Sequence, residues 1–473
     1  MSSANISFDT LPSSIRKPGK YFEFNTRLAV RTLPANVQRV LIVAQGNPGC
    51  VQAPLTAVDV FSDYEAALLF GPGSQAHLMA RAAITANPYL RLSVIGLADD
   101  AAGIAASCTA TFTGPAAGLG VVGLTIGDQT VQTAVTLGAT ATAIASGLAD
   151  KVNSHPSLPV TAAALNGVIT LTARNKGAAG NSIPVSGQAA VDGVTVAVTP
   201  MAGGATDPDI TPALAAVFAD GHTILVTPYA EQASLTALRQ HLDAVSHALE
   251  QRGAIGVYAH TGTLAAATTL AGQVNSGRIT GALLPGSVSL PWEIAAAYAA
   301  VIASEEDPAR PLNTLPLTGI SPPPVKKRLS RMEQETLLAG GVTPLEVGPG
   351  EKVQIVRAIT TYTLDPQGVE DIALLDLTTI RTLDYVRKAM RERISLRFPR
   401  EKLSARTPAK VRSELIDVAY KLEELEILEE VKANLPGLIV ERDLQDPNRL
   451  NAKIPADVVN GLHIFAGRID LLL

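Results

Sequence analysis

The sequence has little of what catalytic sites, disulfide frameworks and membrane spans are made from. Its 473 residues include two cysteines, Cys50 and Cys108, which fit no metal or disulfide spacing, so both are predicted to be small buried side chains. No apolar run approaches the ~20 residues that a transmembrane helix needs, so no membrane insertion is expected. Aromatic residues make up only 4% of the chain, which predicts a core of Ala, Val, Leu and Ile.

A strong charge of either sign is also lacking. The formal net charge is −5, which is small for this length and gives no support to a nucleic-acid or membrane-surface partner. Residues 1–5 show no basic-then-apolar signal pattern, so synthesis in a cytoplasm is expected. The length leaves room for two to four domains of usual size.

The familiar catalytic motifs are missing as well. The seven histidines include no pair at the helical spacing of a zinc protease, and the chain has neither a Gly-x-Ser-x-Gly elbow nor a Walker-type loop. Asp59, His77 and Ser287 are candidates for a hydrolase site, but nothing in the sequence places a base near Ser287. We therefore expect no enzyme, no catalytic residues, no metal and no cofactor. An α/β hydrolase with an appended β domain is kept as the alternative.

Strand-like and helix-like segments alternate in two stretches of the chain. An apolar, β-branched run at 39–44 predicts a buried strand, and residues 75–86 and 90–97 predict a helix and a second strand. Alternation of this kind predicts an α/β core with helices on both faces of a mainly parallel sheet. The pattern returns after residue 207, with strands expected at 222–227, 254–259 and 279–284 and helices at 210–218, 231–249, 263–274 and 291–304.

Between these stretches lies a segment rich in Thr, Val, Ala and Gly, with little charge. Asn166-Gly167 between two alternating runs predicts a tight hairpin, and one helix is expected at 139–152. We interpret residues 101–206 as a β-rich domain inserted into the core. The same composition suggests a second alternative function, a surface adhesin. Strands are expected at 121–126, 129–135, 160–165, 168–173 and 191–198.

The remainder of the chain is richer in charge. A loop is expected at 342–349, a long β-branched strand at 353–364, and helices at 377–398 and 407–432. The first of these helices is strongly basic, which is typical of a solvated helix face or of a contact with an acidic protein surface. Its cations are Arg387, Lys388, Arg391, Arg393, Arg397 and Arg400.

Both ends of the chain look like strands without a partner. Residues 6–11 alternate apolar and polar side chains, residues 21–24 are strand-like, and residues 462–473 stay apolar to the last position. An unpaired apolar strand invites pairing with another chain, although each could also be an edge strand of its own core. The residues expected to make such contacts are Ile6, Phe8, Leu11, Tyr21, Phe22, Phe24, Leu462, Ile464, Phe465, Ile469 and Leu471.

Three stretches of the chain together carry a resemblance to a known family. The first runs from Ile6-Ser-Phe-Asp9 through Pro12, Arg16 and Pro18-Gly19 to Tyr21 and Glu23-Phe24. The second is Val168-Ile-Thr-Leu-Thr-Ala-Arg-Asn-Lys-Gly177 with Gly180-Asn181. The third is Arg328-Leu-Ser-Arg331 with Glu333 and Leu337-Leu-Ala-Gly-Gly341, followed by Val353-Gln-Ile-Val-Arg-Ala-Ile-Thr-Thr361. With these stretches the chain resembles the contractile phage tail sheath family, and most closely its Mu-like members.

The resemblance implies a structural subunit that stacks in hexameric rings around a tail tube and contracts to drive the tube through a host envelope. It implies a core of subtilisin-like fold, and terminal arms that add strands to a sheet in neighbouring subunits. The implied partners are the subunit itself, the tube protein, and baseplate and tail terminator proteins, in a virion tail assembled in the host cytoplasm. The basic helix then becomes a possible tube contact.

The expected division of the chain follows from these patterns. An N-terminal arm is followed by a core that the β-rich domain interrupts, then by a C-terminal sheath domain and a final strand. The corresponding ranges are 1–35, 36–100, 101–206, 207–325, 326–460 and 461–473.

Overall fold

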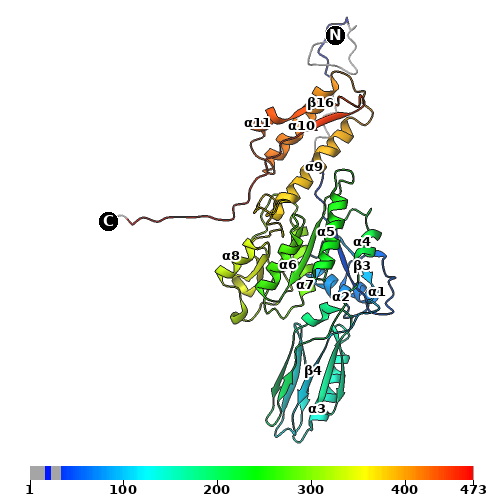
Figure 1. The fold of residues 1–473 in the computed structure, drawn as a ribbon, viewed down its shortest axis with the longest axis vertical. Helices are drawn as coiled ribbons and strands as arrows, with labels where there is room; N and C mark the ends of the chain where they lie inside the picture. Colours follow the sequence, from blue (N-terminus) through cyan, green and yellow to red (C-terminus); the bar gives the residue numbers. More distant parts are fainter. Residues whose placement is uncertain (1–15, 23–32, 472–473) are drawn as a thin grey trace.

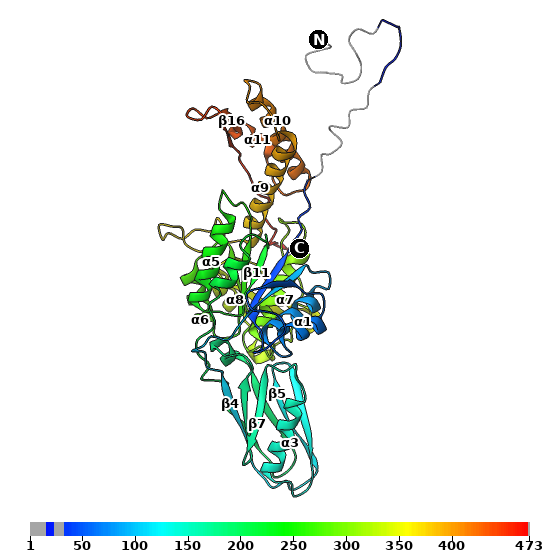
Figure 2. The same ribbon diagram turned by 90° about the vertical axis from the view of Figure 1, so that its right-hand side faces the viewer.

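A computed structural model of the chain describes residues 16–22 and 33–471. The molecule is elongated, with the inserted β-rich domain at one end of a central α/β core and a helical C-terminal domain at the other (Figures 1 and 2). From there the last described residues run away from the body as an extended segment (Figure 1).

The core is built on an eight-stranded sheet of order β15-β14-β13-β12-β11-β1-β3-β2. Pairing is parallel from β14 through β3, and only the two edge strands, β15 and β2, are antiparallel to their neighbours. The prediction of a mainly parallel sheet is confirmed. The strands are β1 (Val40–Gln45), β2 (Ala57–Asp59), β3 (Leu92–Leu97), β11 (Ile224–Val226), β12 (Ile255–His260), β13 (Ile279–Leu283), β14 (Thr343–Val347) and β15 (Val353–Ile355).

Alternate residues of β1 face two different apolar clusters, so both faces of the sheet are buried. Val40, Ile42 and Ala44 pack with side chains of α2 and α7, whereas Leu41 and Val43 pack with α4, α5 and α6. The helices of the core are α1 (Asp63–Phe70), α2 (Gln75–Ala86), α4 (Thr211–Ala216), α5 (Gln232–Ser246), α6 (Leu264–Val274), α7 (Pro291–Ser304) and α8 (Arg331–Ala339).

The inserted domain holds two further sheets, of order β10-β4-β8-β7 and β6-β5-β9, with one helix. The predicted hairpin is present, because Asn166 and Gly167 both have positive φ, as a two-residue primed turn requires. Strands β4 and β9 were not predicted, and β10 is shorter than expected. The elements are β4 (Ser107–Phe112), β5 (Gly120–Ile126), β6 (Gln129–Val135), α3 (Ala141–Asn153), β7 (Val160–Leu165), β8 (Val168–Ala173), β9 (Val185–Ala190) and β10 (Val196–Val198).

The C-terminal domain packs helices against a two-stranded sheet, β16-β17. The helix expected at 407–432 is confirmed as far as Glu424 and is wrong beyond it, because Glu426 and Glu430 adopt left-handed backbone conformations between α10 and α11. The elements are α9 (Leu377–Arg397), α10 (Thr407–Glu424), α11 (Val431–Asn434), β16 (Ile439–Arg442) and β17 (Leu450–Lys453).

Two predictions for residues 342–364 are wrong. The expected loop at 342–349 contains β14, whose Thr343 and Pro344 pair with β13. The expected long strand at 353–364 ends as β15 at Ile355. Beyond it, Ile359 and Thr360 are fully buried, and their N–H groups bond to the Thr343 hydroxyl and the Leu375 carbonyl. Their β-branched composition therefore reflects burial rather than a strand.

The buried histidines predict a stability that falls with acid. Burial lowers the pKa of His241 to about 4, and Arg252 and His222 push it the same way. The unfolded chain therefore binds a proton at this site near pH 6.5, while the folded chain resists until about pH 4. The free energy of unfolding should be level above pH 6.5 and fall between pH 6.5 and 4, with a slope of at most about 1.4 kcal/mol per pH unit from this group. Thermal unfolding midpoints measured over this range should fall with it.

His241→Gln should make that pH profile shallower, because glutamine does not titrate. The same substitution at His155, an exposed side chain, is the matched control and should leave the profile unchanged. A profile that is equally steep in the wild type and in His241→Gln would contradict the assignment.

Candidate functional site

The described part of the C-terminal segment has no strand and is almost wholly exposed. The exposed fractions of Phe465 and Ile469 are 88% and 98%, and Leu462, Ile464 and Leu471 are between 79% and 83% exposed. A strand needs a partner for its hydrogen-bond ladder, and none of the described residues of the same chain forms a strand pair with this segment. The sequence-based expectation of a strand at 462–473 is therefore not met within a single chain, and residues 472–473 lie outside the described residues.

One side chain attaches this segment to the core. His463 Nδ1 lies 2.9 Å from Asn313 Nδ2, and His463 Nε2 lies 3.5 Å from Asp376 Oδ1. Burial lowers the pKa of His463, Arg357 lowers it further, and Asp376 opposes both. The arm thus leaves the body from a fixed point, and the apolar residues beyond it face solvent.

The N-terminal residues are described only in part. Tyr21 is 42% exposed and Phe22 is 87% exposed, and the Tyr21 hydroxyl donates to the Lys17 carbonyl at 3.0 Å. Ile6, Phe8, Leu11 and Phe24, which were also expected to make contacts, lie outside the described residues.

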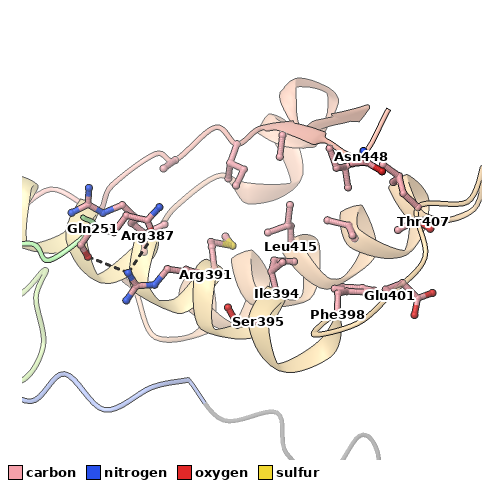
Figure 3. A pocket seen from close by; sticks show the side chains of 18 of the residues that line it. Gln251, Arg387, Arg391, Ile394, Ser395, Phe398, Glu401, Thr407, Leu415 and Asn448 are labelled. Atoms are coloured by element: carbon pink, nitrogen blue, oxygen red, sulfur yellow. Dashed lines mark hydrogen bonds between the residues drawn. The ribbon is translucent and has the colours of Figure 1, made fainter. Parts of the chain in front are cut away.

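An apolar groove of about 630 Å³ opens in the C-terminal domain between α9, α10 and β17. Ile394, Phe398 and Leu415 project into it, with Arg387, Arg391 and Gln251 at one end and Asn448, Thr407 and Glu401 at the other (Figure 3). Its apolar lining comes from a stripe along α9, from the facing side of α10, and from β17 and the residues that follow it. The members are Leu383, Val386, Met390, Ile394, Phe398, Leu403, Val411, Leu415, Leu450, Ala452, Ile454 and Ala456.

We did not predict the groove, although its signal is in the sequence. Residues 386, 390, 394 and 398 are apolar at four-residue spacing, so they form one stripe along α9. Alternate residues 450, 452 and 454 are apolar in the strand region. Each stripe has the pattern of an ordinary core face, and only the fold shows that a space remains between them.

The short sheet beside the groove has only two strands. β16 and β17 pair antiparallel over four residue pairs, from Ile439↔Lys453 to Arg442↔Leu450. Among the described residues no third strand pairs with either of them. A two-stranded sheet is marginal by itself and offers free N–H and C=O groups at its edges.

The basic residues of α9 are mostly engaged within the chain. The side chain of Arg393 is 4% exposed, and its Nη1 lies 3.0 Å from Glu414 and 2.6 Å from Asp417. Burial would raise the pKa of Asp417, but hydrogen bonds from Arg393 and Lys421 outweigh it and lower that pKa. Arg397 lies 3.5 Å from Glu414. These pairs join α9 to α10.

The other basic residues of this helix face different surroundings. Arg387 bonds to Asp384 and to the Ser246 carbonyl, Lys388 to the Ala35 carbonyl, and Arg391 to Gln251. Arg400 is exposed and makes no ion pair with any described residue. A tube contact by these six residues remains a prediction.

The candidate hydrolase residues do not form a triad. His77 Nδ1 accepts from the Gly73 N–H, and its Nε2 lies 2.9 Å from Asp63, so both nitrogens are engaged. Ser287 Oγ accepts from the Ser289 N–H. Asp59 accepts from the Ser93 hydroxyl.

Two structural searches bear on other classes of function. Within residues 16–22 and 33–471, no group of three or more His, Cys, Asp or Glu side chains is placed to hold a metal ion. Over the same residues, no helix is both long enough and apolar enough to cross a lipid bilayer.

Comparison with known proteins gives two family matches on this chain. Residues 203–361 match the phage tail sheath protein central domain, and residues 369–471 match the phage tail sheath C-terminal domain. The Mu-like prophage FluMu tail sheath protein of Haemophilus influenzae is 33% identical over 99% of this chain and 100% of its own length. The chain belongs to the phage tail sheath family. The resemblance to Mu-like sheath proteins is thereby confirmed.

Solved structures agree at the level of the fold. A sheath tail protein from Desulfitobacterium hafniense superposes with a TM-score of 0.53 at 14% identity, covering 94% of this chain and 97% of that one. The sheath complex of an extracellular contractile injection system in its contracted state gives a TM-score of 0.52 at 12% identity, covering 97% and 98%. The mixed α/β architecture with several sheets is therefore that of sheath proteins.

Proposed function

We propose that this sheath protein is the polymerising subunit of a contractile phage tail. It would stack as hexameric rings around a tail tube and contract to drive the tube through a host envelope. The tube protein, baseplate and tail terminator proteins are its proposed partners, and its place is the virion tail, assembled in the host cytoplasm. We propose no enzyme activity. The observation that carries the proposal is the exposed apolar C-terminal segment on a chain whose C-terminal domain has a free sheet edge and an apolar groove.

The link between subunits would be strand addition. The C-terminal segment of one copy would extend the β16-β17 sheet of a neighbour through backbone hydrogen bonds, and its apolar side chains would fill the groove below. Backbone pairing depends little on side chains, so such a link can persist while the bodies it joins rotate. A contact from a terminal segment to a different domain of the next copy is head-to-tail, and a repeated head-to-tail contact that does not close builds a helix.

Two further assignments belong to the same proposal. The core would be a subtilisin-like sheath fold without peptidase activity, since a fold alone does not determine function. A tube contact at this end of the basic region would be made best by Arg400, which lies just beyond α9, because the buried Arg393 is committed to Glu414 and Asp417. Long-range attraction of this kind would weaken with salt.

The experiment is negative-stain microscopy of the purified protein and of a groove variant. The wild type should form tubes of uniform width. Ala452→Arg should prevent them while leaving the thermal unfolding midpoint of the chain unchanged, because Ala452 is exposed and lines the groove. The apolar arm could bind in the groove only by burying the introduced charge, which is strongly unfavourable, so the contact should be lost.

The matched control is Glu441→Arg, which places the same side chain at an exposed position of β16 that does not line the groove. It should leave the tubes intact. Small monodisperse particles of the wild type at high concentration would overturn the proposed function. Tubes of normal yield from Ala452→Arg would overturn the groove as the arm's binding site.

A further inference from the structure

A second, polar cleft of about 330 Å³ lies where the C-terminal domain meets the core. Residues 36–39 form one wall, the segment 251–255 that enters β12 forms another, and α9 forms the third. We call it the waist cleft. Its cations are Arg39, Arg252, Arg381, Lys388 and Arg391.

Four of these five cations have no carboxylate partner among the described residues. Each instead donates to a neutral oxygen at 2.7 to 3.2 Å, and charged groups left without an opposite charge attract anions. Arg252 is the exception, since it lies 2.7 Å from Glu250. The four pairs are Arg39 with the Asp220 carbonyl, Arg381 with the Glu305 carbonyl, Lys388 with the Ala35 carbonyl and Arg391 with Gln251.

The carboxylate on the wall does not balance this charge. Asp384 accepts from both terminal nitrogens of Arg278, at 2.7 and 3.1 Å, and from Arg387 at 2.8 Å. The charge of Asp384 is therefore already balanced by Arg278 and Arg387, neither of which is one of the five cations. The waist cleft keeps an excess of positive charge.

Arg381 shows that the cleft lacks an acceptor. The residue is 7% exposed, and its buried Nη1 has no hydrogen-bond partner, whereas Nη2 bonds to the Glu305 carbonyl. Burial lowers the pKa of Arg381 to about 10, against the opposing effect of Glu305 and Asp307, so it is charged at neutral pH. Neither of those carboxylates lines the cleft. A buried guanidinium N–H without a partner is costly, and a carboxylate entering the cleft would satisfy it.

The same chain carries a complementary surface. The last turn of α10 and the loop that leads to α11 hold four exposed glutamates, Glu424, Glu426, Glu429 and Glu430. None of them forms an ion pair with a described residue. Lys432 is the nearest exposed cation in sequence, so the loop keeps a net negative charge. We call residues 423–430 the acidic loop.

Two of these four glutamates lie at strained backbone positions. Glu426 and Glu430 have φ values of 55° and 51°, a left-handed conformation that costs free energy for a residue with a side chain. Glycine would adopt the same conformation without that cost. The loop therefore maintains two glutamates at positions where its own stability favours another residue.

The two surfaces do not meet within one chain. No residue of the acidic loop lines the waist cleft. None of its four exposed glutamates forms an ion pair with a described cation of the cleft. The two surfaces can meet between copies in a repeated head-to-tail contact.

We propose that the acidic loop of one copy inserts its glutamates into the waist cleft of a neighbouring copy. This inference rests on the proposed function, since it assumes a polymer of this chain, and it adds a second contact in which the terminal segments take no part. Because one wall of the cleft is the linker at 36–39, insertion of the loop also fixes the place where the N-terminal region joins the core.

A charge-exchange experiment tests the pairing. Lys388→Glu with Arg391→Glu reverses the cleft, and Glu424→Lys with Glu429→Lys reverses the loop at positions of ordinary backbone conformation. Each pair of changes should raise the protein concentration needed for tube formation by roughly tenfold or more, because like charges then face each other. The chain that carries all four changes should recover most of the wild-type assembly, because every contact is again between opposite charges.

The control is Glu335→Lys with Glu370→Lys, at exposed residues outside both surfaces. It changes the net charge of the chain by as much as the loop reversal does. It should assemble as the wild type does, and all variants should unfold at the wild-type temperature. Failure of the fourfold variant to recover assembly would overturn the pairing, as would normal assembly of either reversed pair. Absence of tubes from the wild type would instead count against the proposed function.

Discussion

Deletion of residues 461–473 is expected to abolish polymers and leave a folded, soluble chain. The described residues of this segment contribute almost nothing to the core, because all of them except Gly461 and His463 are exposed. The unfolding midpoint should therefore stay within about 2 °C of the wild type, as for changes at exposed sites. Sedimentation and negative-stain microscopy would measure the loss of tubes.

Two full-length variants separate the arm from the effect of truncation. Phe465→Pro keeps the chain length but removes a backbone donor and an apolar side chain, so it should impair assembly strongly. Arg468→Ser changes an exposed residue of the same segment that pairs only with Asp470, and should assemble normally. Polymers that persist after deletion of 461–473 would show that this segment is not the link.

Arg393→Ala is expected to destabilise the C-terminal domain by about 2–3 kcal/mol. Breaking a fully buried ion pair costs about 3–5 kcal/mol. The cost expected for Arg393→Ala is smaller, because Glu414 and Asp417 keep contact with water. The two carboxylates would also be left facing each other without the cation between them. Denaturant unfolding followed by circular dichroism would give the change in free energy.

Arg400→Ala removes a cation from the same basic helix region at an exposed position, and should change the free energy of unfolding by less than about 0.5 kcal/mol. A loss of stability equal to that of Arg393→Ala would show that exposure does not distinguish the two residues. No loss in Arg393→Ala would mean that the α9–α10 ion pairs do not stabilise this domain.

The α/β core was readily predicted because its local patterns and its packing agree. The run that begins at residue 39 is apolar from Val40 to Ala44, and β1 is buried on both faces by helices that the sequence also predicts. Asn166-Gly167 specifies a turn by backbone preference alone. In such places composition, periodicity and tertiary contacts all favour one structure.

The interfaces were harder to predict, for physical reasons. Ile359 and Thr360 have the composition of a strand but are buried in irregular backbone, since burial selects the same residue types. The basic residues of α9 appeared as one cluster in the sequence, yet Arg393 faces α10 while Arg391 faces the core. Which side of a helix meets a neighbour depends on packing that distant parts of the chain decide.

The inserted domain is joined to the core by two connecting segments that lie side by side. Ile104 pairs with Ala205 and Ser107 with Ala202, so the path out to this domain and the path back run side by side. Mechanical load that passes between the core and the C-terminal domain can therefore bypass the inserted domain, which lies at the far end of the molecule (Figure 1). Evolution could exchange or resize this outlying domain without rebuilding the core or the C-terminal domain.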